Sequence, residues 1–170
     1  MRNRTIILIV NILLILLIQI FLLNNVLLFN RFHPYLYLLI ILMLPAGVNK
    51  NIVMLSGFAI GFVIDIFSYT FGMHAAATTI LAFLRPFVLS FLFESDDENR
   101  NSLISPQLLS YRVFIIYILT LLFIHHFILF MIEAGGFSNF GRTFSVIIVS
   151  VIFSSILILI YELFMQIRRS

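Results

Sequence analysis

The sequence lacks cysteine and tryptophan, and it has few charged residues. Without cysteine, disulfides, thiolate metal sites, haem thioethers and cysteine nucleophiles are excluded. Charged residues make up 10% of the 170 residues, whereas soluble domains carry about 25%. The net charge of +3 comes from basic residues that are scattered between apolar runs and gathered near the ends. That distribution does not indicate a nucleic-acid partner.

Hydrophobic residues, in contrast, make up 62% of the chain. This composition predicts one integral membrane domain over residues 1–170, with no room for a soluble domain of useful size. Backbone groups in lipid must be satisfied within their own segment, and the alternation of a membrane barrel is missing, so we expect helices. Arg2 and Arg4 precede a long apolar run without a small-residue cleavage site, which predicts a retained signal anchor.

Six apolar segments can be separated by length and by breaks in hydropathy. Their approximate bounds are residues 5–23, 35–45, 52–69, 74–93, 113–132 and 144–165. The expected fold class is therefore an all-α integral membrane protein with about six transmembrane helices in one bundle. Ten or so helical residues span roughly 15 Å, about half a bilayer. The second segment is therefore either a short helix lengthened by Phe32 and His33 or a re-entrant element.

Lys and Arg in the short loops set the expected orientation. With six spans and the N-terminus inside, seven basic residues fall on the cytoplasmic side, against Arg31 and Arg142 on the outer side. The seven are Arg2, Arg4, Lys50, Arg100, Arg112, Arg168 and Arg169. We therefore expect both termini in the cytoplasm.

One polar loop, residues 94–111, is expected on the cytoplasmic side. Its acidic residues are Glu94, Asp96, Asp97 and Glu98. Charge runs of this kind are usually solvated connectors. The alternative is a docking loop for a cytoplasmic partner.

Asp65 is the most distinctive residue, because it is a carboxylate inside an apolar run. Such a group is costly in a membrane unless it faces protein or water. Gly57, Gly61 and Asp65 are spaced by four and share one helical face. This small and polar stripe predicts a surface for helix packing or partner contact. A carboxylate wetted from the outer loop, and a proton or cation site, are the alternatives for Asp65.

The other polar residues of the apolar segments give little support for catalysis. Arg85 is expected to snorkel toward the cytoplasm, with Pro86 marking a kink near the interface. Adjacent helical residues point about 100° apart, so His125 and His126 do not make a two-ligand metal face. No nucleophile has a visible base beside it. We therefore expect no enzyme activity, cofactor or metal.

Serines recur along the last apolar segment. We expect them to pack helices together and to bond to the backbone of their own helix. They are Ser145, Ser150, Ser154 and Ser155.

The region 57–84 carries an ordered set of residues. It begins with Gly57-Phe58 and Gly61, continues with Ile-Asp-Ile-Phe-Ser at residues 64–68, and ends with Phe-Gly-Met-His-Ala at residues 71–75. A Gly-rich helix, an Asp between aliphatic residues and a Gly turn opening the next helix resemble the MreD family of bacterial rod shape-determining membrane proteins. Phe71 stands where an aliphatic residue is commoner in that family. The Pro-Tyr-Leu-Tyr-Leu-Leu run at 34–39 and the later Leu44-Pro45 also resemble its second helix.

The resemblance implies a non-catalytic component of the cell-elongation machinery in the bacterial plasma membrane. It implies an MreC-like periplasmic protein as partner, and with it a link between actin-like filaments and the enzymes that build peptidoglycan. Gly57, Gly61, Asp65, Gly72 and His74 would then form a helix-packing or partner interface.

The resemblance also implies a fold similar to the substrate-binding subunits of energy-coupling-factor vitamin transporters. An alternative function follows, a small-molecule binding subunit of a transporter. It would use Asp65, His74 and Glu133 at the outer ends of the helices. Few convergent polar groups are visible in the sequence for such a pocket.

Overall fold

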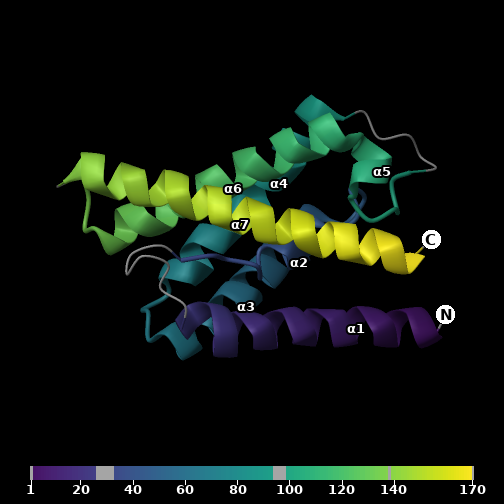
Figure 1. Ribbon diagram of the computed structural model, residues 1–170, viewed down its shortest axis with the longest axis horizontal. Helices are drawn as coiled ribbons and strands as arrows, with labels where there is room; N and C mark the ends of the chain where they lie inside the picture. Colours follow the sequence, from purple (N-terminus) through teal and green to yellow (C-terminus); the bar gives the residue numbers. More distant parts are fainter. Residues whose placement is uncertain (1, 26–32, 94–98, 138, 170) are drawn as a thin grey trace.

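The computed structural model describes residues 2–25, 33–93, 99–137 and 139–169, and the elements in these ranges are helical (Figure 1). The long helices are α1 (Arg2–Leu17), α3 (Lys50–Ser68), α4 (Met73–Leu92), α6 (Tyr111–Glu133) and α7 (Phe140–Arg169). The short ones are a π-helical turn η1 (Ile18–Leu22), a 3-10 turn η2 (Leu23–Asn25), α2 (Leu39–Leu42) and α5 (Pro106–Leu109). The chain is therefore an all-helical protein in its described parts.

Within the described residues, five helical stretches are long and apolar enough to cross a membrane. They are Ile6–Asn25, Lys50–Ser68, Met73–Leu92, Tyr111–Glu133 and Phe140–Ile167. This supports a multi-pass helical membrane protein. It also corrects the expected number of six transmembrane helices, because only four residues of the 35–45 segment, those of α2, are α-helical.

Residues 33–45, the crossing segment, nevertheless run through the bundle from one end toward the other. At its start, the backbone N–H of His33 donates to Ser150 of α7; at its end, the carbonyl of Leu44 accepts from Arg85 of α4. Extended backbone advances about 3.3 Å per residue, whereas a helix advances about 1.5 Å. The crossing segment is not helical before α2, so it reaches further through the bundle than a helix of the same number of residues. Because of this extra pass, both termini lie at the same end of the bundle (Figure 1).

The crossing segment is also the centre of the core. Tyr37, Leu38 and Ile41 are completely buried. Around them, α4 lies between α3 and α6, and α6 packs against α7. Irregular backbone at membrane depth is tolerated only where protein or water satisfies it, and here the long helices enclose it.

The α3–α4 hairpin is held together by the close approach of its two helices. A Cβ on Gly61 would lie 2.6 Å from the Ala75 Cα, and one on Gly57 would lie 2.9 Å from the Thr78 carbonyl oxygen. The glycine stripe therefore faces α4, inside the chain. The turn that joins the helices contains Gly72 at φ +78°, in the left-handed region that favours glycine.

Candidate functional site

Gln19 is the first of several buried polar side chains that bond to the backbone of the crossing segment. Its Oε1 accepts from the N–H of Leu36 at 2.7 Å and of Tyr37 at 3.3 Å, and its Nε2 donates to the Pro34 carbonyl at 3.2 Å. Gln19 is completely buried. One side chain therefore satisfies three backbone groups that have no helical partner. The sequence held a signal for this, since Gln19 is one of two amides, with Asn11, in the apolar run 5–23, but it did not show the target.

Two serines of α7 accept hydrogen bonds from the backbone of the same segment. Ser150 Oγ accepts from the His33 N–H at 3.4 Å, and Ser154 Oγ accepts from the Tyr35 N–H at 2.9 Å. The expectation that these serines bond to their own helix is wrong for this pair. It holds for Ser155, whose hydroxyl donates to a carbonyl three residues earlier.

At the other end of the segment, the Arg85 side chain donates to one carbonyl group and one hydroxyl group. Its Nη2 donates to the Leu44 carbonyl, and its Nε donates to the Tyr117 hydroxyl at 2.9 Å. Tyr117 in turn donates to the Leu42 carbonyl at 2.8 Å. Arg85 is only 1% exposed, so the expectation of a snorkelling side chain is wrong. The guanidinium is thus held by the Leu44 carbonyl directly and by the Leu42 carbonyl through the Tyr117 hydroxyl, and carbonyl oxygens are common partners for charges at membrane depth.

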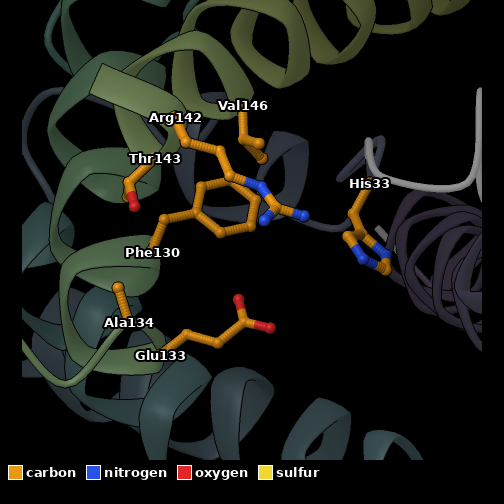
Figure 2. A pocket seen from close by; sticks show the side chains of 7 residues that line it. All are labelled: His33, Phe130, Glu133, Ala134, Arg142, Thr143 and Val146. Atoms are coloured by element: carbon orange, nitrogen blue, oxygen red, sulfur yellow. The ribbon is translucent and has the colours of Figure 1, made fainter. Parts of the chain in front are cut away.

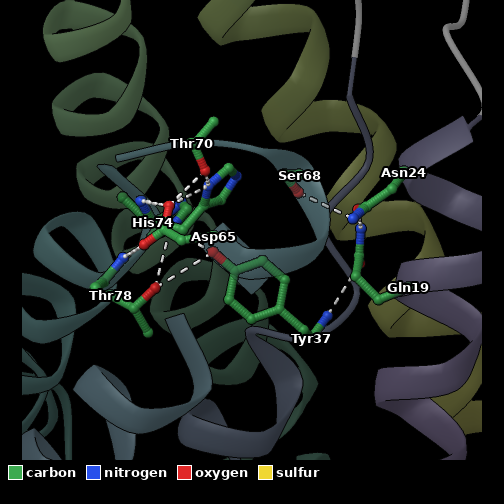
Figure 3. A network of polar contacts seen from close by, with 10 residues as sticks. Gln19, Asn24, Tyr37, Asp65, Ser68, Thr70, His74 and Thr78 are labelled. Atoms are coloured by element: carbon green, nitrogen blue, oxygen red, sulfur yellow. Dashed lines mark hydrogen bonds and ion pairs between the residues drawn. The ribbon is translucent and has the colours of Figure 1, made fainter. Parts of the chain in front are cut away.

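Asp65 caps the start of α4 (Figure 3). Its Oδ1 accepts from the N–H of His74 at 3.0 Å and its Oδ2 from the N–H of Ala75 at 2.8 Å. Thr70 donates to Oδ1 at 2.5 Å, and the His74 ring nitrogen Nδ1 lies 3.2 Å from it. The first N–H groups of a helix lack intrahelical partners and attract negative charge. Asp65 is 3% exposed, so these protein groups, and not bulk water, surround the carboxylate.

The two histidines of α6 face the crossing segment. His125 Nε2 lies 3.0 Å from the Tyr37 hydroxyl, and His126 Nε2 lies 3.1 Å from Ser154 Oγ. The Tyr35 ring packs 5.3 Å from the ring of His126, centroid to centroid. In the described ranges no group of three His, Asp or Glu side chains could hold a metal ion. The contacts of the two rings are hydrogen bonds and aromatic packing in the core.

A polar pocket opens at the end of the bundle away from the termini. One lobe has a volume of about 210 Å³ and is lined by His33, Phe130, Glu133, Arg142 and Thr143, among others. Figure 2 shows Glu133, Arg142 and His33 around one open space.

A second lobe of about 340 Å³ shares His33 and Glu133 with the first. It continues inward toward Asn24, Thr70 and His74. The structure thus brings together His74 and Glu133, two of the three residues expected for a small-molecule site. Asp65, the third, is not part of the lining.

The other residues of interest fall into two groups. Gly57, Gly61 and Gly72 belong to the α3–α4 hairpin and line neither lobe. The acidic residues Glu94, Asp96, Asp97 and Glu98 lie outside the described residues, so the proposed docking loop stays a prediction.

Fold and site together define a helical, multi-pass membrane protein with several polar side chains buried in an apolar core. Comparison with protein-family models, with curated proteins and with solved structures found no match.

Proposed function

We propose that this protein is a non-catalytic component of the bacterial cell-elongation complex in the plasma membrane. It binds an MreC-like periplasmic protein and helps to connect actin-like filaments with the enzymes of peptidoglycan synthesis. The observation that carries the proposal is the motif at residues 57–75, which resembles the MreD family and folds as one tightly packed hairpin.

Five residues of the motif have a physical role in that hairpin. Gly57 and Gly61 let α3 and α4 approach, Asp65 caps α4, and Gly72 makes the turn. The His74 ring contacts the capping carboxylate of Asp65 through Nδ1. These roles explain why the residue types occur in this order. They also mean that α4 already occupies the glycine stripe, so a partner must bind elsewhere.

We propose α1 as the helix that contacts the partner's membrane segment. It lies at the edge of the bundle, and only 17% of its span is buried, compared with 50% for α6 (Figure 1). An apolar cavity of about 110 Å³ runs between α1, α2 and α7. A membrane helix of the partner that packs against α1 would cover the exposed surface of α1.

The orientation in the proposal has both termini in the cytoplasm. Because the crossing segment acts as a pass, the basic residues keep their expected seven-to-two distribution. Lys50 and Arg112 begin α3 and α6 at the end of the bundle that holds the termini. The polar pocket would then face the periplasm.

Affinity purification in a gentle detergent, followed by mass spectrometry, tests the proposal. We expect a single-span periplasmic coiled-coil protein to be recovered.

Because the sequence contains no cysteine, site-specific cross-linking can test the α1 surface. Leu13→Cys on α1 carries a thiol-linked photo-crosslinker, and Phe91→Cys on α4 is the control. Both side chains are exposed. We expect cross-linking of the partner from position 13 only. Recovery of no such protein would reject the function, and equal cross-linking would reject the α1 surface.

The alternative, a vitamin-binding subunit of a transporter, is favoured by one observation, the polar pocket. The pocket contains His74 and Glu133, which that hypothesis requires. Purified protein that takes up or retains a vitamin would favour this alternative over the scaffold.

A further inference from the structure

We propose that the polar pocket is a binding site for a small zwitterion, with its ammonium group at Glu133 and its anionic group at Arg142. The shared chemistry is that of a free zwitterionic solute or of the phosphoethanolamine head group of a lipid. This inference does not depend on the proposed scaffold function.

The first observation is a pair of opposite charges that do not neutralise each other. Glu133 ends α6 and Arg142 lies in the first turn of α7, so only a short turn separates them. Both line the same lobe, and both side chains extend into its open space (Figure 2). In the part of the chain that the structure describes, neither side chain has an ion pair or hydrogen bond. A molecule that carries both charges can bridge them with two charge-assisted contacts.

The second observation is the wall opposite these charges. The His33 ring lines both lobes and is stacked on Tyr35, with the ring planes 6° apart and the centroids 6.2 Å apart. His74 lines the inner lobe and is 5% exposed, and its Nε2 has no hydrogen-bond partner among the described atoms. A buried polar atom without a partner is costly, so a ligand that bonds to it would gain affinity.

The balance of charge favours a zwitterion over a simple ion. In the lobe that contains both, Glu133 is the acidic lining residue and Arg142 is the basic one. A lone anion would face the Glu133 carboxylate, and a lone cation would face the Arg142 guanidinium. Like charges brought close together discriminate against the wrong ligand.

The volume limits the size of the ligand. Sites for drug-sized molecules measure about 300–1,000 Å³. The lobe that is lined by both Glu133 and Arg142, about 210 Å³, lies below that range. An amino-alcohol phosphate or an amino acid fits this space better than a large vitamin.

The free-solute arm of the test uses O-phosphoethanolamine and glycine as probes on the purified full chain. Isothermal titration calorimetry measures binding directly, which suits a protein without tryptophan. Inorganic phosphate and ethanolamine are the single-charge controls. We expect at least one zwitterion to bind about tenfold or more tightly than either control, a difference of about 1.4 kcal/mol.

The lipid arm uses native mass spectrometry of the protein from nanodiscs with equal phosphatidylethanolamine and phosphatidylglycerol. If the natural source is a lipid, we expect one retained phosphatidylethanolamine.

Glu133→Gln and Arg142→Gln should each weaken zwitterion binding, or lipid retention, about tenfold. Arg112→Gln, which removes an exposed positive charge at the other end of α6, should leave it unchanged. Failure of zwitterions in both arms, equal binding of the single-charge controls, or equal losses in all three variants would overturn the proposal. The partner pull-down is read separately, so either proposal can fail alone.

Discussion

The α3–α4 hairpin and the crossing segment solve different problems in the same bundle. In the hairpin, two regular helices approach closely at their glycines. The backbone N–H groups at the start of α4 are the ones bonded to a side chain, the carboxylate of Asp65. In the crossing segment the backbone is irregular, and side chains from α4, α6, α7 and η1 supply its hydrogen bonds. The hairpin is built from residues close in sequence, whereas Tyr35 finds its partner, Ser154, 119 positions away.

In this protein, most of the buried polar side chains form hydrogen bonds to backbone groups. At several breaks in the helical pattern, one of them takes the place of the missing backbone partner. Asp65 does this at a helix start, and Gln19 and Arg85 do it along the crossing segment. An unsatisfied backbone group in lipid costs several kcal/mol, which explains their presence.

The largest effect is expected from Gly61→Leu, which attacks the hairpin. A Cβ there already lies 2.6 Å from the backbone of Ala75, and backbone cannot move aside as a side chain does. Overpacking costs about 1–3 kcal/mol and occasionally more, and we expect the upper end or complete loss of folding. The measurement is the monodisperse fraction in size-exclusion chromatography. Gly141→Leu, where nothing lies within 4 Å, is the control and should behave as wild type.

The next effect is expected from Gln19→Leu, which attacks the crossing segment. Three backbone groups lose their partner, and each unmade bond costs about 1–3 kcal/mol. Melting followed by circular dichroism should show a clear loss of stability. Gln107→Leu changes an exposed glutamine of α5 and should have little effect. A melting curve of Gln19→Leu equal to that of wild type would contradict the role of this amide.

A smaller effect is expected from Tyr117→Phe. The hydroxyl group donates to the Leu42 carbonyl and accepts from Arg85, and its removal should cost about 1–3 kcal/mol. Tyr111→Phe, which loses an exposed hydroxyl bonded to Gln166, is the matched control and should cost less. Equal losses in the two variants would mean that the Arg85 anchor adds nothing.

The smallest effect comes from a pair of neighbouring serines. Ser154→Ala leaves the Tyr35 N–H without its acceptor and His126 Nε2 without its hydroxyl partner, and should cost about 1 kcal/mol or more. Ser155→Ala removes only a bond to its own helix, to the Ile152 carbonyl, and should be close to neutral. Thermal melting of the two variants side by side gives the difference, and a reversed order would argue against the long-range bond.

Hydropathy and spacing predicted the membrane class, the long helices and the shared face of Gly57, Gly61 and Asp65. Those features are local, because they depend on residues within a few turns of one another. The cap on α4 is nearly as local, since Asp65 and Ala75 are ten residues apart. Asp65, however, lies near the end of α3 and not directly before Met73, where α4 begins, so a search for a capping residue next to the helix start would have missed it.

The role of the crossing segment was not predictable in the same way. A length estimate at about 1.5 Å per residue assumes a helix, so an extended pass looks too short to cross. Arg85 looked like a snorkelling residue because its acceptor, the Leu44 carbonyl, is 41 residues away and belongs to broken backbone. The polar pocket likewise depends on His33 and Arg142 meeting from opposite ends of the sequence.

Amide hydrogen exchange of the crossing segment, measured by mass spectrometry in nanodiscs, compares the two regions within a single sample. The peptide that contains Tyr35, Leu36 and Tyr37 should exchange as slowly as the centre of α6. In Gln19→Leu it should exchange about tenfold or more faster, while the α3–α4 hairpin stays unchanged. Fast exchange of this peptide in the wild-type protein, or no change in the variant, would show that buried side chains do not hold this irregular backbone in place.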